Sequence, residues 1–229
     1  MVAEVWPARC LSCALTVITA LIAPIASAQI PRSIEENEGR ILLQVWALDD
    51  QILHPESAVD DRLLEEARLV LSGMVYGWDF VYRPPDPRRE VAGVFELTSL
   101  GTVADGDAGL TVLELAQDGP THFAAFEFRA DQVERRYLEF WRLFAQDSSA
   151  GVGRAQLHDG FAGRQAALQD ALRDAVRARL RFQYQDRPRE ARGSLALIDP
   201  PVVQTDTGDY VYRVEVSIIL DEVRPYLTF

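Results

Sequence analysis

The sequence predicts an α+β domain with a largely antiparallel sheet and about three helices packed on one face. Strand-like and helix-like patterns come in separate runs along the chain, and most gaps between strands are too short for a parallel crossover. The last apolar pattern alternates strictly with a period of two. The expected element order is β-α-β-β-β-β-α-α-β-β, in one domain that spans residues 40–229.

The first half of this domain is expected to hold five strands and one helix. Arg40 to Leu48 is rich in Ile, Leu, Val and Trp, which favour a strand. A helix from about Ser57 to Met74 follows, with Ser57 as its cap and apolar residues at helical spacing. Aromatic residues then alternate with others over residues 78–83, and Pro84-Pro85-Asp86-Pro87 ends that strand. The remaining strand candidates are Val94–Leu100, Leu110–Gln117 and His122–Arg129.

The second half is expected to hold two helices and two strands. Asp131 and Glu134 resemble a capping box at the start of a helix that runs to Gln146 and carries a broad aromatic stripe. Residues 147–160 are expected to form a loop, because small residues gather at its start. The other elements are a helix at Gly163–Phe182, a strand at Gly193–Ile198 and an alternating strand at Tyr210–Leu220.

The N-terminus has the three parts of a secretory signal peptide. A weakly positive start precedes an uncharged, apolar run from Leu11 to Ile25, and Ala26-Ser27-Ala28 follows. We expect residues 1–28 to be removed after Ala28, and residues 29–39 to form a polar leader. The alternative is an uncleaved anchor, although the run is shorter than the about 20 apolar residues of a membrane-spanning helix. Cleavage predicts a periplasmic or secreted protein without disulfides, because both cysteines, Cys10 and Cys13, lie in the removed segment.

Composition excludes several classes of function. The net charge of -12 disfavours nucleic acid and anionic lipid surfaces as partners. All 23 basic residues are arginine, and the lack of lysine excludes Schiff-base chemistry, P-loop phosphate binding and Ser-Lys dyads. No nucleotide-binding, zinc-protease or serine-hydrolase motif is present. No cofactor, no metal and no transmembrane segment after cleavage are therefore expected, and the oligomeric state stays open.

The sequence contains only weak candidates for a metal-binding or catalytic site. Asp105, Asp107 and Gly109 resemble the start of a calcium loop, but a hairpin turn fits them better. The three histidines, His54, His122 and His158, match no metal-binding spacing. The carboxylates with apolar strand neighbours, where burial could raise a pKa enough for acid–base chemistry, are Asp79, Glu114 and Glu127. A solvated strand face explains them equally.

Two features are typical of a contact surface. The third helix carries Arg173, Arg177 and Arg181 at four-residue spacing, and Asp170 and Asp174 lie three residues before the first two. The segment 78–89 joins aromatic residues, prolines and arginines, which is the chemistry of interface hot spots. Its candidate contact residues are Trp78, Phe80, Tyr82, Arg83, Arg88 and Arg89. The alternative for this segment is a core strand followed by a rigid connection.

The preferred hypothesis is a non-enzymatic binding or assembly module of the cell envelope, with an envelope protein as its partner. It uses the 78–89 segment, together with the arginine helix, as its contact surface. The alternative is a hydrolase that acts on an envelope polymer through two strand carboxylates. No catalytic residue is identified from the sequence.

Overall fold

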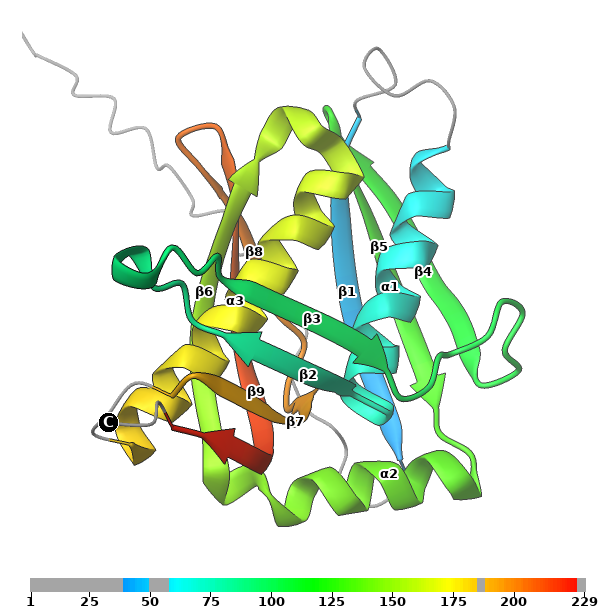
Figure 1. The fold of residues 1–229 in the computed structure, drawn as a ribbon. Coiled ribbons are helices and arrows are strands. Elements are labelled where there is room, and N and C mark those ends of the chain that lie inside the picture. Colours follow the sequence, from blue (N-terminus) through cyan, green and yellow to red (C-terminus); the bar gives the residue numbers. More distant parts are fainter. Residues whose placement is uncertain (1–38, 50–57, 185–187, 226–229) are drawn as a thin grey trace, which may run out of the picture. The chain divides into compact units, whose positions relative to one another are not determined.

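The computed structural model describes residues 39–49, 58–184 and 188–225, all within the unit that spans residues 31–229 (Figure 1). The strands are β1 (Arg40–Leu48), β2 (Trp78–Arg83), β3 (Val94–Ser99), β4 (Leu110–Asp118), β5 (Thr121–Arg129), β6 (Ser148–Gln156), β7 (Glu190–Leu197), β8 (Val202–Asp206) and β9 (Asp209–Arg224). The helices are α1 (Val59–Val75), α2 (Gln132–Leu143) and α3 (Gly160–Gln183). The α+β class is confirmed.

The strands form two sheets, and every pairing between the described strands is antiparallel. The first sheet has the order β1-β5-β4, and the second has the order β3-β2-β7-β9-β6, with β8 also paired to β9. β9 is long enough to pair with β6 and β8 along its first half and with β7 along its second. Strands that are distant in sequence therefore meet in the second sheet.

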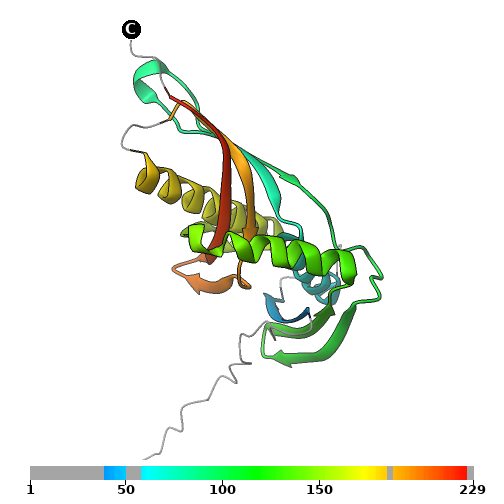
Figure 2. The same cartoon turned by 90° about the horizontal axis from the view of Figure 1, so that it is seen from below.

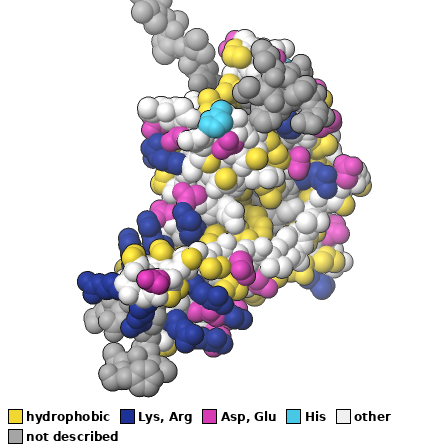
Figure 3. Space-filling view, turned by 45° about the horizontal axis from the view of Figure 1, so that its top comes forward, with side chains coloured by type: hydrophobic (Ala, Val, Ile, Leu, Met, Phe, Trp, Pro, Cys, Tyr) yellow, Lys and Arg dark blue, Asp and Glu magenta, His cyan; other side chains and the backbone are white. Residues whose placement is uncertain are grey.

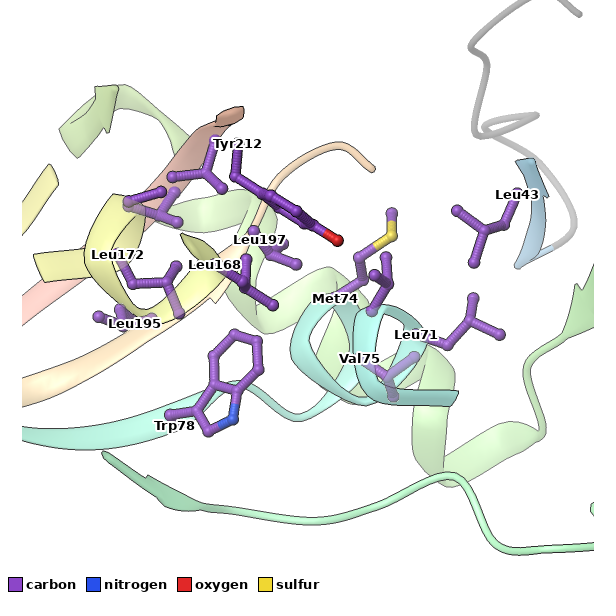
Figure 4. Close-up of a cluster of buried hydrophobic side chains, with 14 of the residues drawn as sticks. Leu43, Leu71, Met74, Val75, Trp78, Leu168, Leu172, Leu195, Leu197 and Tyr212 are labelled. Carbon is purple, nitrogen blue, oxygen red and sulfur yellow. The ribbon is translucent and has the colours of Figure 1, made fainter. Parts of the chain in front are cut away.

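Helix α1 contacts both sheets, and the hydrophobic core forms around it. Its C-terminal half is buried on nearly all sides, because β1 and β5 lie against one side and β7 against another. Gly73 of this helix provides the space for the Trp78 ring, since a Cβ there would lie 1.9 Å from the ring. Figure 4 shows Met74, Val75 and Leu71 of α1 in one cluster with Trp78, Leu195 and Tyr212.

Helix α3 lies against β6 and β9 at very short range. Gly151 and Gly153 face this helix, where a Cβ on either residue would lie 2.1 Å from a backbone oxygen of α3. The helix presents Ala167, Ala171 and Ala175 at the contact, and all three are fully buried. Small residues on both elements allow the two backbones to approach each other.

Two expectations about the second half of the domain are wrong. Residues 147–160 do not form a loop, because residues 148–156 form β6, whose glycines allow close packing against α3. The strand β8 was not expected, although Pro200-Pro201 does end β7. β8 pairs with the start of β9 as an antiparallel hairpin. The tight turn between the two strands is formed by Thr207 and Gly208, which both have positive φ. The order is therefore β-α-β-β-β-β-α-β-α-β-β-β.

The helix boundaries are close to those expected. The capping box at Asp131 and Glu134 is confirmed, because each side chain accepts a hydrogen bond from the backbone N–H of the other residue. The described start of α1 has Ala58 before it, without a side-chain cap, and the expected cap Ser57 lies outside the described residues. None of the described helices is both long and apolar enough to cross a membrane.

Candidate binding groove

A groove of about 520 Å³ opens where α3 faces the β2–β3 hairpin. Most of its lining comes from two parts of the chain that are far apart in the sequence, residues 82–95 of the hairpin and residues 170–181 of the helix, and Val152 of β6 completes it. Its lining residues are Tyr82, Arg83, Pro85, Gly93, Val94, Phe95, Val152, Asp170, Arg173, Asp174, Arg177 and Arg181. Figure 3 shows arginine side chains gathered on the lower left of the face in view, where α3 ends and the β2–β3 connection projects.

The hairpin side of the groove is aromatic and stiff. The rings of Tyr82 and Phe95 meet edge to face, with 6.3 Å between their centroids. Pro85 packs against Gly93 across the mouth of the hairpin, since a Cβ on Gly93 would lie 2.9 Å from Pro85 Cδ. Proline fixes φ and its ring lies against Gly93, so this wall has few alternative conformations.

The helix side of the groove is arginine-rich. Arg173 and Arg177 each bind, through Nη2, the aspartate three residues earlier, as the sequence spacing predicted. These aspartates, Asp170 and Asp174, also accept backbone N–H groups from the open edge of β6, both at 3.2 Å. Arg181 makes no ion pair with the part of the chain that the structure describes. The helix therefore offers guanidinium N–H donors that are not consumed inside the protein.

Arg83 is held in place at the end of β2 by Glu190. Its Nε lies 2.5 Å from the Glu190 carboxylate, which Arg192 and Arg224 also approach at 2.8 and 3.5 Å. The hydrogen bonds from Arg83 and Arg192 lower the pKa of Glu190 to about 2. Glu190 therefore stays charged under all ordinary conditions and fixes the position of Arg83.

Replacing Glu190 with glutamine should flatten the acid dependence of stability. A carboxyl whose folded pKa lies below its unfolded value stabilises the fold above the unfolded pKa, near 4.5, and this contribution disappears as the pH falls towards 2. The wild type should therefore lose more stability than Glu190→Gln between these two values. Urea unfolding midpoints across this pH range measure the difference, and parallel curves would contradict the role of Glu190.

The structure separates the candidate contact residues into two groups. Trp78, Phe80 and Tyr82 are buried, with 6%, 2% and 5% of their surface exposed, so these aromatic side chains pack in the core. The charged members are on the surface: Arg83 at the end of β2, and Arg88 and Arg89 in a single 3-10 turn, η1 (Pro87–Arg89). Only Tyr82 and Arg83 of the six line the groove.

The three candidate carboxylates lie outside the groove. Glu127 is buried between Arg129 and Arg40, and their hydrogen bonds and charges lower its pKa. A general acid needs the opposite shift, so Glu127 is not suited to that role. Glu114 lies on β4, which is exposed along most of its length, and Asp79 is exposed and accepts a hydrogen bond from Ser194.

The candidate calcium loop and the described histidines are explained by local structure. Asp107 accepts the N–H of Gly109 at 2.8 Å, which is the turn geometry expected for this segment. His158 pairs with Asp159 at 3.3 Å on the surface, His122 lies at the start of β5, and His54 lies outside the described residues. Among the described residues no cluster of His, Cys, Asp or Glu could hold a metal ion.

The sequence did not indicate that β3, the second strand of the hairpin, lines the groove. Val94 and Phe95 carry no charge and match an ordinary strand, so no local signal distinguishes them. The prolines and arginines around residue 85 were the only available indication that this region forms a wall.

The fold and the groove define an α+β domain with an arginine-lined surface groove. A protein-family model matches residues 21–226, and the chain belongs to this family of uncharacterised proteins. It is similar to an uncharacterised protein of Treponema pallidum (strain Nichols), with 24% identity over 197 residues, which cover 82% of this chain and 83% of that protein. No solved structure matches the chain.

Proposed function

We propose that this protein is a non-enzymatic binding module of the cell envelope, and that its groove takes up an acidic segment of a partner protein. The observation that supports this proposal is the groove between α3 and the β2–β3 hairpin, where four arginines surround an aromatic wall. The proposed compartment rests on the signal-peptide pattern of residues 1–28.

Arginine suits this role because its planar guanidinium can bind a carboxylate through two parallel hydrogen bonds. Arg173 and Arg177 each use Nη2 on an aspartate, which leaves their other N–H groups available. Arg181 is exposed at the open end of the row. In a protein with a net charge of -12, this local cluster would attract a negatively charged segment over a short range.

The rigid walls of the groove also favour binding. The Pro85–Gly93 contact fixes the hairpin, and Glu190 fixes Arg83, so little conformational freedom is lost when a ligand enters. A hydrolase is less well supported, because the carboxylates that line the groove, Asp170 and Asp174, are already bound to arginines and to the backbone of β6.

Charge reversal at Arg181 should weaken partner recovery. Arg181→Glu replaces a groove donor with a repelling carboxylate, and loss of one charge-assisted hydrogen bond alone corresponds to roughly a tenfold weaker affinity. The measurement is quantitative recovery of partners from a solubilised envelope extract, with the tagged full chain as bait. Arg213→Glu on β9 is the matched control, since Arg213 is also exposed and also makes no ion pair with the described residues.

Equal recovery by wild type, Arg181→Glu and Arg213→Glu would count against the groove. The same preparation tests the compartment, because the proposal requires the native protein to begin at Gln29. An intact mass that begins at Met1, from protein found in the cytosol, would overturn the envelope assignment.

A further inference from the structure

We infer that α2 lies on the surface of a lipid bilayer through an apolar stripe that the rest of the described chain covers only in part. Val133, Tyr137, Phe140 and Leu143 form this stripe and are 57%, 40%, 43% and 78% exposed. The aromatic stripe expected from the sequence includes the first three, and the exposure of Leu143 adds it to them. Figure 2 views the structure from the side of α2, where this helix runs across the front.

A separate row on the helix makes most of the contacts that hold α2 in place: Leu138 and Trp141 are buried, and Trp141 Nε1 donates a hydrogen bond to the Tyr76 carbonyl at 3.2 Å. One stripe residue also contacts the domain, because the Tyr137 ring meets the Tyr76 ring edge to face, with 5.3 Å between their centroids. Glu134 accepts a hydrogen bond from the Tyr76 hydroxyl at 2.9 Å. The helix is therefore firmly attached to the domain by one row, while an adjacent apolar row is presented outward.

The charges of α2 fit anionic lipid headgroups. Its exposed charged residues are Arg135, Arg136, Arg142 and Glu139, because Glu134 points inward. An apolar row of aromatic and aliphatic residues beside arginines is the composition of helices that lie in the membrane interface. The net negative charge of the whole chain acts weakly here, because salt screens charges beyond ~8–10 Å.

The same charges disfavour a second copy of the chain as the occupant. At helical spacing Arg136 lies within the stripe, so two such stripes packed together would bring like charges close to each other. A helix of 12 residues also provides a narrow strip, whereas a stable dimer buries at least about 1,200 Å².

A fluorescent probe on α2 tests the inference in the full chain. NBD is attached to Leu143→Cys in a Cys10→Ser, Cys13→Ser background, and vesicles of phosphatidylcholine with roughly one third phosphatidylglycerol are added. NBD emission should shift to the blue and increase. Phe182→Cys is the matched control, because Phe182 is an apolar residue near the end of another helix, α3, and is 85% exposed. Its emission should not change.

A second variant tests the rest of the stripe. Val133→Asp, ten residues before the probe on the same face, should weaken the vesicle affinity reported at residue 143 by ~10-fold. Three results would overturn the inference: no change at residue 143, an equal change at residue 182, or a change at residue 143 that needs no vesicles and rises with protein concentration. The last result would indicate a second copy as the occupant.

Discussion

Replacing Gly153 with valine is expected to prevent the domain from folding. A Cβ at this position would lie 2.1 Å from the Ala167 oxygen and 2.2 Å from the Ala171 nitrogen, both in the backbone of α3. A side chain could rotate away, but a helix backbone can move only as a unit. Overpacking in a core typically costs ~1–3 kcal/mol and occasionally more. Here α3 would have to separate from β6, so we expect the loss of most of the ~5–15 kcal/mol that stabilises a domain.

Ala150→Val is the matched control for Gly153→Val. Ala150 lies in the same strand but is exposed, and valine is a good strand residue, so this change should leave stability within ~0.5 kcal/mol of the wild type. Circular dichroism and urea unfolding of both variants provide the comparison. A cooperatively folded Gly153→Val protein with near-normal stability would show that α3 does not approach β6 as closely as described.

The close contact between β6 and α3 also explains why the sequence did not predict β6 as a strand. Sequence patterns associate Ser-Ser-Ala-Gly with loops, because glycine weakens strands and serine favours turns. A strand that touches a helix backbone requires glycine for a different reason, namely the absence of a Cβ. The alanines that complete the contact lie on α3, more than ten residues further along the chain. The alternation of apolar and polar residues in β9 could be recognised from the sequence, because it depends on that strand alone.

The groove could be predicted only in part. The arginine row and its aspartates follow from helical spacing, and the structure confirms both ion pairs. The aromatic alternation correctly identified β2 as a strand, and the burial of its aromatic face agrees with the alternative interpretation of this segment as a core strand followed by a rigid connection. The groove has the hairpin and α3 as its two main walls because of the strand order β3-β2-β7-β9-β6. No local sequence pattern specifies this order.

A buried charge cluster in the core also escaped sequence reasoning. Arg164 and Glu66 are 3% and 4% exposed, and their side chains meet at 2.6 Å. The Tyr212 hydroxyl donates to the same carboxylate oxygen at 2.8 Å, and the Arg164 guanidinium lies 4.7 Å from the centre of the Trp46 ring. A charged residue on an amphipathic helix is normally expected to face water, so nothing local marked this pair as internal.

Neutralising Glu66 is expected to destabilise the domain by about 3–5 kcal/mol, the usual effect of breaking a buried ion pair by removing one partner. Burial opposes the charge on Arg164, and Glu66 is the main group that offsets this and raises its pKa. Glu66→Gln leaves that guanidinium charged and without a counter-ion in the core. Glu65→Gln, one residue earlier and exposed, is the matched control and should be nearly neutral.

A double variant separates the charge effect from packing. In Glu66→Leu with Arg164→Met neither member of this pair carries a charge, so this protein should be more stable than Glu66→Gln even though four polar contacts around Tyr212 and Trp46 have been removed. Burial already raises the pKa of the Tyr212 hydroxyl well above its ordinary value, so this group stays neutral in every variant. Urea unfolding at neutral pH ranks the variants. If Glu66→Gln were as stable as Glu65→Gln, the pair could not be an essential part of the core, and the region around Trp46 would have to admit water to solvate Arg164.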